Sequence, residues 1–172
     1  SRELYVEAED FLETPVPKYK RLCPGGLECR LKGAYLIICT GCKRDEAGNL
    51  LEIFATYDPD SRGGNPADGR KVKGATIHWV DAATAVDAEC LLYDNLFTDP
   101  APDGADKNFL DCLNPASLEV AVGCKLEAGL KDAVPGDRFQ FMRVGYFCLD
   151  KDSTPGRLVF NRSVGLKDSF KM

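Results

Sequence analysis

The stretch of the sequence best suited to binding a polyanion holds three cations within four positions. Arg70, Lys71 and Lys73 precede an apolar run that ends at Val80, and the stretch contains the only histidine and the only tryptophan of the chain. Such cations can face a polyanion, whereas the apolar run suits a half-buried β-strand. By itself the pattern is weak evidence for binding, because the basic end of a strand is usually only solvated.

Eight cysteines could indicate a metal site or disulfides. The pair Cys39 and Cys42 has CxxC spacing, and together with Cys23 and Cys29 it would supply the four thiolates of a zinc site. However, the interval between Cys23 and Cys29 is too long for a usual zinc knuckle, and Cys39 ends an apolar, strand-like run. We therefore expect no metal and reduced, core-like thiols, as in a cytoplasmic protein. A metal hydrolase that uses these cysteines and His78 is the distant alternative.

The bulk composition is that of an ordinary soluble globular protein. The chain has 172 residues, of which 44% are hydrophobic and 28% charged. No apolar run approaches the ~20 residues of a membrane span, and none resembles a secretory signal, so we expect a cytoplasmic protein without a membrane partner. The net charge of −5 argues mildly against a protein that binds nucleic acid. A domain whose positive and negative charges are segregated can still present one basic face.

Short alternating or apolar runs separated by turn residues predict an all-β protein, as in sandwiches or barrels. Residues 27–32 alternate, which places Arg30 and Lys32 on the outward face of one strand. Residues 35–39 and 51–57 are expected to pair as a hairpin, and residues 71–80 to form one strand. A proline- and aspartate-rich segment at 99–107 reads as a connector between two small barrels.

Beyond these patterns, segments spread in order along nearly the whole chain resemble glutaminyl-tRNA synthetases and their close glutamyl relatives. The ending of the chain favours the glutamine enzymes over the archaeal-type glutamate enzymes. The matching segments are residues 18–22, 30–32, 34–35, 56–58, 70–74, 77–80, 92–94, 96–97, 114–115, 117–118, 139–141, 143, 145–150, 159–162 and 164–166.

This resemblance implies the anticodon-binding, C-terminal part of a class I synthetase. The implied fold is two small β-barrels similar to ribosomal protein L25, one inserted in the other. The proximal barrel would comprise residues 1–12 plus 108–172, and the distal barrel residues 13–107.

The resemblance also implies which side chains contact the anticodon. In the family, a glutamine and an arginine that match Gln140 and Arg143 read the middle base. The family position that contacts the third base matches Arg21, and the positions that contact the first base match Arg30 and Lys32. Unpaired bases expose edges that need donors and acceptors, which these side chains provide. In a regular strand Gln140 and Arg143 would lie on opposite faces, and the turn at residues 143–145 removes this obstacle.

Two of the implied contacts depart from the family pattern. Lys18 completes the implied anticodon-binding set, although many bacterial members have glutamine there, and Lys32 stands where arginine is common. Lysine cannot make the bidentate contact of arginine.

We expect no catalytic residue and no cofactor in this chain. It lacks a phosphate-cradling glycine loop and the HIGH and KMSKS signatures of class I synthetases. ATP and Mg would bind in the catalytic domain of the full-length protein. The expected partners of this chain are that catalytic domain and the anticodon loop of tRNA(Gln). A monomer that binds no DNA is expected. The alternatives are the anticodon domain of a glutamyl-tRNA synthetase, and a structural or protein-interaction β module.

Overall fold

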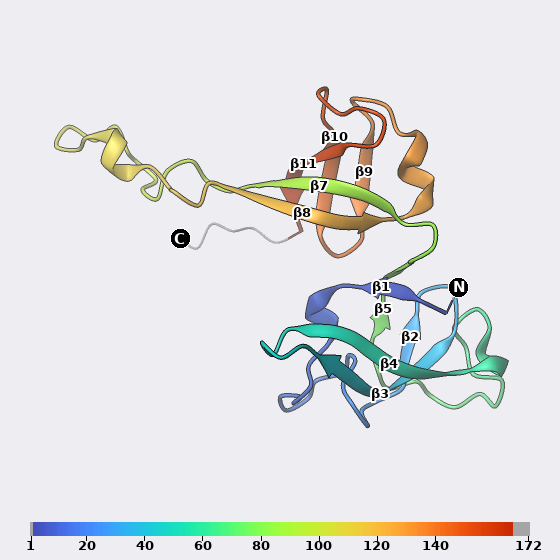
Figure 1. Cartoon of the computed structure of the whole chain (residues 1–172). Coiled ribbons are helices and arrows are strands. Elements are labelled where there is room, and N and C mark those ends of the chain that lie inside the picture. Colours follow the sequence, from blue (N-terminus) through green and yellow to red (C-terminus); the bar gives the residue numbers. More distant parts are fainter. Residues whose placement is uncertain (1, 167–172) are drawn as a thin grey trace. The chain divides into compact units, whose positions relative to one another are not determined.

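The structure is a computed structural model, and it describes residues 2–166. Strands dominate these residues, which confirms the prediction of an all-β fold, and the helical segments are four short 3-10 turns. The chain divides into two compact units, unit 1 ending at Ala83 and unit 2 beginning at Thr84 (Figure 1). Among residues 2–166, no helix has the length and apolar character needed to cross a membrane. The 3-10 turns are η1 (Ala8–Asp10), η2 (Pro59–Ser61), η3 (Phe109–Cys112) and η4 (Ala128–Asp132).

Unit 1 contains a two-stranded sheet and a four-stranded sheet. In the first, β1 (Leu4–Val6) pairs antiparallel with β6 (Trp79–Asp81). The second has the order β4-β3-β2-β5, in which β2 and β5 run parallel. The antiparallel β3–β4 pair confirms the predicted hairpin, and both strands run further toward the turn than expected. The members of this sheet are β2 (Cys29–Leu31), β3 (Leu36–Arg44), β4 (Leu50–Asp58) and β5 (Thr76–Ile77).

The core of unit 1 follows from the alternation of apolar residues along β2. Cys29 and Leu31 are buried, whereas Arg30 between them is partly exposed. Because successive side chains of a strand point to opposite faces, the buried pair turns Arg30 away from the core. The other buried members of this core are Phe11, Leu22, Ile37, Cys39 and Ile77.

The prediction of a single strand over residues 71–80 was wrong for the first half of this stretch. Its second half forms two short strands instead of one. Residues 71–75 form no strand, and His78 separates β5 from β6. The reason for the division is that the two short strands pair with different sheets, β5 with β2 and β6 with β1. Gly74 crosses close to the backbone of Glu28, and a Cβ atom on it would lie 2.2 Å from the Glu28 carbonyl oxygen.

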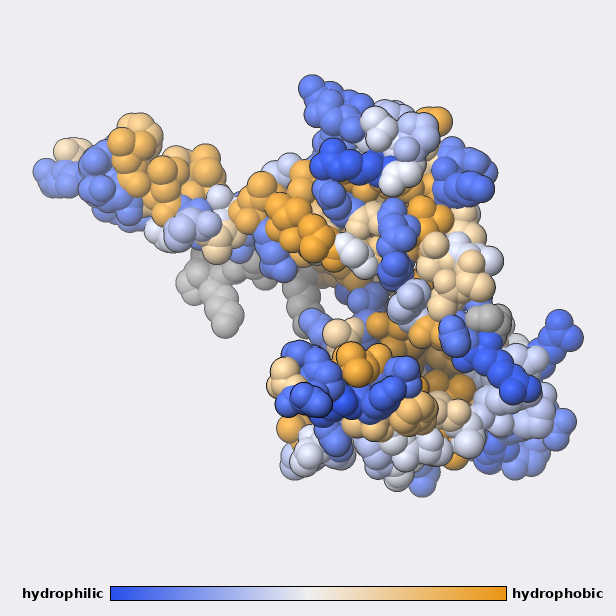
Figure 2. Space-filling view, viewed as in Figure 1, coloured by the Kyte–Doolittle hydropathy of each residue, from blue (hydrophilic) through white to orange (hydrophobic). Residues whose placement is uncertain are grey.

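Unit 2 is built on one five-stranded sheet of order β8-β7-β11-β10-β9, which is antiparallel except for the β7–β11 pair. Its core comprises Phe147, Phe160 and Leu149 together with Ala88, Cys90 and Leu158. Figure 2 shows hydrophobic side chains along β7, β8 and the segment 94–117 that joins them. Leu96 of this segment and Val122 of β8 are exposed. The strands are β7 (Val86–Tyr93), β8 (Leu118–Leu126), β9 (Arg138–Phe141), β10 (Gly145–Leu149) and β11 (Leu158–Gly165).

These units differ from the expected barrel boundaries. Residues 1–12 were assigned with 108–172, but β1 pairs within unit 1, and Phe11 bridges to Leu22 of the same unit. Residues 84–107 were assigned with 13–83, but β7 lies between β8 and β11 of unit 2. The segment 99–107 therefore connects β7 to β8 within one unit. The closure of the sheets into barrels, one inserted in the other, stays a prediction.

Candidate nucleic-acid interface

The β9–β10 hairpin presents Gln140 to solvent. Gln140 lies between Phe139 and Phe141, which are half-buried and pack against the core of unit 2. The Phe141 ring stacks on Phe147 with the ring centroids 4.2 Å apart. Because the two phenylalanines turn inward, alternation along the strand turns the Gln140 amide outward, as an exposed donor and acceptor.

Arg143 lies in the turn of the same hairpin, in a backbone conformation that L-residues rarely adopt. Its φ angle is +65°, and the turn is closed by the Val144 amide, which donates to the Phe141 carbonyl at 3.0 Å. The strand resumes at Gly145, where a Cβ atom would lie 2.6 Å from the Val164 carbonyl oxygen. A left-handed non-glycine residue costs roughly 1–2 kcal/mol. The hairpin thus carries exposed Arg143 and Gln140 at one end, three residues apart.

Tyr146 is a third candidate on this hairpin, and the sequence analysis missed it. It pairs directly with Gln140 across the strands, and on its other side it pairs with Val164 of β11. Its side chain is 48% exposed, so the ring is available beside the Gln140 amide. Unpaired bases stack on such rings. The signal in the sequence was the alternation of Tyr146 with the buried Phe147.

Arg21 is held in place by a buried carboxylate. Its Nη1 atom lies 3.3 Å from Oδ1 of Asp10, whose side chain is fully buried, and donates to the Glu9 carbonyl at 3.2 Å. The Arg21 side chain itself is 38% exposed. Charge-assisted contacts of this kind fix a guanidinium while leaving its outer surface accessible.

Lys18 shares the backbone feature of Arg143. Its φ angle is +66°. Among residues 2–166, Lys18 and Arg143 are the non-glycine residues with positive φ. Strained conformations of this kind cluster at binding sites, where the strain is compensated by the surrounding fold. Both positions were predicted from the sequence to contact the anticodon, for reasons unrelated to their backbone.

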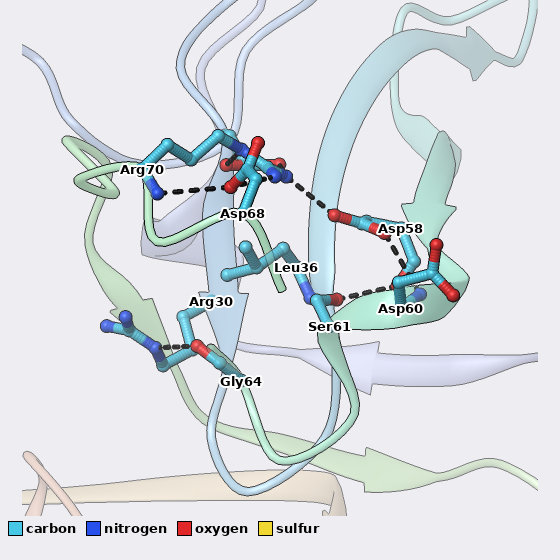
Figure 3. A network of polar contacts seen from close by, with 9 residues as sticks. Arg30, Leu36, Asp58, Asp60, Ser61, Gly64, Asp68 and Arg70 are labelled. Atoms are coloured by element: carbon cyan, nitrogen blue, oxygen red, sulfur yellow. Dashed lines mark hydrogen bonds and ion pairs between the residues drawn. The ribbon is translucent and has the colours of Figure 1, made fainter. Parts of the chain in front are cut away.

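Arg30 and Lys32 lie at the outward side of β2 and just after its end. Arg30 Nε donates to the Gly64 carbonyl, so its side chain bends toward the loop after β4 (Figure 3). Lys32 is exposed, and its carbonyl accepts from Trp79 Nε1 at 3.0 Å. The alternation argument that placed the two side chains on one face agrees with the burial of Leu31 between them.

Arg70, which its basic stretch suggested could face a polyanion, is engaged by carboxylates of the protein. Its guanidinium lies 2.7 Å from Glu28, 2.6 Å from Asp58 and 2.9 Å from Asp68 (Figure 3). The hydrogen bond from Arg70 lowers the pKa of the Asp58 carboxyl, and the three carboxylates raise the pKa of Arg70. Arg70 therefore closes a loop although its side chain is still 40% exposed, and Lys71 and Lys73 are the other exposed cations of this stretch.

The cysteines provide neither disulfides nor a metal centre in the part of the chain that is described. All eight thiols are free, and residues 2–166 contain no cluster of three or more metal-ligating side chains. Burial raises the pKa of the Cys29 thiol to about 11 and that of Cys90 to about 12. Such thiols stay protonated at neutral pH, so they are poor nucleophiles and poor ligands.

The predicted site residues thus fall into two groups. Gln140 and Arg143 share one hairpin of unit 2. Unit 1 carries the four predicted cations. Lys18 and Arg21 precede β2, Arg30 lies in β2, and Lys32 follows it directly.

Comparison with known proteins gives a family for both units. Two family models described as the anticodon-binding domain of class I (E and Q) tRNA synthetases match residues 1–58 and 76–150. The chain is 57% identical over 172 residues to the glutamine–tRNA ligase of Cupriavidus taiwanensis, covering 99% of this chain and 29% of the relative. The enzymes of Pseudomonas putida and Alteromonas mediterranea are 53% and 54% identical, and the match covers 99% of this chain and 30% of each relative.

The chain thus spans less than a third of the length of these curated relatives. Both units carry a match to the same domain type. The chain belongs to the anticodon-binding domains of the class I (E and Q) tRNA synthetases.

Proposed function

We propose that this chain binds the anticodon loop of glutamine tRNA and that Gln140 and Arg143 read the middle base, a uridine. The observation that carries the proposal is the β9–β10 hairpin, on which an exposed amide and an exposed guanidinium stand three residues apart. Family membership and the similarity to glutamine–tRNA ligases support it.

The chemistry of the two side chains matches a uridine edge. Uridine offers two carbonyl acceptors that flank one N–H donor. A glutamine amide supplies one acceptor and two donor hydrogens, and an arginine supplies donors only. Gln140 can therefore accept from the N–H and donate to one carbonyl, while Arg143 donates to the other. A cytidine presents an amino group in place of one carbonyl, which would oppose the donor that faces that position, and a bare ring nitrogen in place of the N–H, which would leave the Gln140 carbonyl without a donor.

We assign the flanking bases to the cations of unit 1. Arg21 would contact the third base, and Arg30 with Lys32 the first, while Lys18 completes the contact surface. The arginines carry rigid forks that suit base edges, whereas the lysines are point charges that suit phosphates. The tethering of Arg21 to Asp10 supports a role that needs a fixed orientation.

We further propose that the full-length protein attaches glutamine to tRNA(Gln) with ATP in the cytoplasm. ATP and Mg would bind in a separate catalytic domain, and the protein would act as a monomer. The identities to glutamine–tRNA ligases over 29% to 30% of their length support this assignment.

The test is binding of this chain to glutamine tRNA, compared with the same tRNA carrying a cytidine as the middle anticodon base. Titration at two salt concentrations separates phosphate contacts, which depend on salt, from base contacts. A preference for uridine of about 1–3 kcal/mol is the expected result. Salt-dependent binding without preference would contradict base reading by Gln140 and Arg143.

The glutamate alternative has its own arm in this experiment. Glutamine and glutamate anticodons share the middle uridine and differ in the third base, which is guanosine for glutamine and cytidine for glutamate. Tighter binding of the guanosine form supports the glutamine assignment and a reading role for Arg21. Tighter binding of the cytidine form would support the glutamyl alternative, and no binding at low salt a structural module.

A further inference from the structure

We propose that Gly64 is a positioning residue for Arg30: its carbonyl holds the Arg30 guanidinium so that the two terminal nitrogens face outward as an end-on fork. This inference rests on the proposed function and deepens it. It assigns a role in recognition to the loop between η2 and Arg70, whose own side chains are not predicted to contact RNA.

The contacts of Arg30 define the orientation of its guanidinium. Nε donates to the Gly64 carbonyl (Figure 3). Nη1 lies 3.5 Å from Thr76 Oγ1, which is a weak contact. A guanidinium has two edges that can bind a ligand in bidentate fashion, one that uses Nε and one formed by the two terminal nitrogens. Because Nε is occupied by the protein, the edge left for a base or phosphate is the terminal one.

Position 64 has no room for a side chain while Arg30 keeps its observed place. Its φ angle is +86°, and a Cβ atom would lie 2.9 Å from both Cγ and Cδ of Arg30. Its neighbour Gly63 has nearly the same φ angle, +88°, but a Cβ atom there would meet nothing within 4 Å. The two glycines therefore share the backbone requirement and differ in the contact with Arg30.

The loop that carries Gly64 is fixed to the sheet of unit 1. The Gly64 amide donates to the Ser61 carbonyl at 2.8 Å. The fully buried Ser61 hydroxyl donates to the Asp58 carbonyl at 2.6 Å and accepts the Leu36 amide at 2.9 Å (Figure 3). Arg70 clamps the same segment through Asp58. The Gly64 carbonyl is thus held before any ligand arrives, and a preorganised side chain loses less entropy on binding.

Four variants of the chain test the proposal: Gly64→Ala, Gly63→Ala, Arg30→Ala and the double variant that combines Gly64→Ala with Arg30→Ala. Binding to a glutamine anticodon stem-loop is measured for each, with thermal melting as the check of folding. We expect Gly64→Ala and Arg30→Ala each to weaken binding roughly 5- to 150-fold. We expect Gly63→Ala to bind like the parent chain, although it imposes the same backbone strain. The double variant should bind no worse than Arg30→Ala, since Gly64 acts through Arg30.

A readout without RNA separates this inference from the proposed function. The Arg30 Nε–H resonance should exchange slowly with water in the parent chain and in Gly63→Ala, and rapidly in Gly64→Ala. An Nε–H that stays protected in Gly64→Ala, or a Gly63→Ala variant that loses binding equally, would overturn the positioning role. If the parent chain binds no stem-loop but its Arg30 Nε–H is protected, the proposed function and the recognition role of Gly64 are overturned. The contact between Arg30 and Gly64 would still be supported.

Discussion

Arg21 and Asp10 form an ion pair of 3.3 Å in which the carboxylate is fully buried and the guanidinium reaches the surface. A buried charge is costly unless it is paired and hydrogen-bonded. Arg21 therefore has two roles in our assignment, as a ligand of the third anticodon base and as the counter-ion of Asp10. The pair ties recognition to the stability of unit 1.

This pairing predicts that Arg21→Ala lowers stability as well as binding. We expect a loss of about 1–3 kcal/mol in the free energy of unfolding, because one partner of a buried acceptor is removed. Arg21→Lys, which keeps a cation near Asp10, should lose less stability but still lose the preference for a guanosine third base. Urea unfolding curves and stem-loop titrations measure the two effects, and unchanged unfolding of Arg21→Ala would refute the dependence on the pair.

Arg143 allows binding and stability to be separated. Arg143→Asn should keep the turn, because asparagine tolerates the left-handed conformation, and should weaken binding to uridine-containing stem-loops roughly 5- to 150-fold. Arg143→Gly should also lose binding, and it should raise the free energy of unfolding by about 1 kcal/mol by relieving the backbone. Affinity and chemical denaturation are measured on both variants. Full affinity in either one excludes Arg143 as a base reader.

Tyr146 should contribute through its ring rather than its hydroxyl. We expect Tyr146→Ala to cost about 1–3 kcal/mol of binding, the range measured for one base stacked on an aromatic ring, and Tyr146→Phe to cost little. Tyr93 has the same exposed fraction, 48%, so Tyr93→Phe and Tyr93→Ala serve as matched controls elsewhere on the sheet. If Phe and Ala at position 146 bind equally, the stacking role is wrong.

The basic stretch after Gly69 should contribute to the salt dependence of binding through Lys71 and Lys73, and not through Arg70. A cation that neutralises one phosphate changes the slope of log affinity against log salt by about 0.7 for a single strand. Lys73→Ala should show this change if the stretch faces the RNA backbone. Arg70→Gln should leave the slope as it is, because Arg70 is engaged by three carboxylates. A reduced slope in Arg70→Gln would contradict the loop-closing role.

The buried thiols predict a pH dependence of stability in alkali. Burial raises the pKa of Cys29 from 9.0 to about 11 and that of Cys90 to about 12. The unfolded chain ionises these thiols first, so their contribution is fully present below about pH 9 and is lost as the pH rises toward 11 to 12. Denaturation curves between pH 8 and 10.5 should show falling stability, with a weaker fall in Cys29→Ala. Both thiols should resist alkylation at pH 8 until the chain is unfolded.

Much of the fold was predictable because each strand carries its own pattern. The alternation of Cys29 and Leu31 around Arg30 identified β2, and the hairpin of β3 and β4 followed from two β-rich runs around a glycine turn. What the sequence could not give was the partner of each short strand. Residues around His78 belong to two sheets, and a run of apolar residues contains no information on where the chain changes sheet.

The sequence proposed residues for the candidate site but contained no information on their contacts. The resemblance supplied Gln140 and Arg143, and the structure places both on one exposed hairpin end. It could not supply the tethers of Arg21 and Arg30, since Asp10 and Gly64 are distant in sequence and carry no motif. The engagement of Arg70 was missed for the same reason: two of its three carboxylates, Glu28 and Asp58, come from distant segments, and a local charge count does not include them.

The left-handed backbone at Lys18 and Arg143 has a consequence for anyone who redesigns this sequence. A procedure that optimises folding alone would place glycine or asparagine at both positions, because these residues fit the observed dihedral angles better. The two substitutions would be scored as improvements, and each would delete a side chain that we assign to the RNA. Positions such as Lys18 and Arg143, where the native residue fits the backbone conformation less well than glycine or asparagine would, should therefore be excluded from such an optimisation.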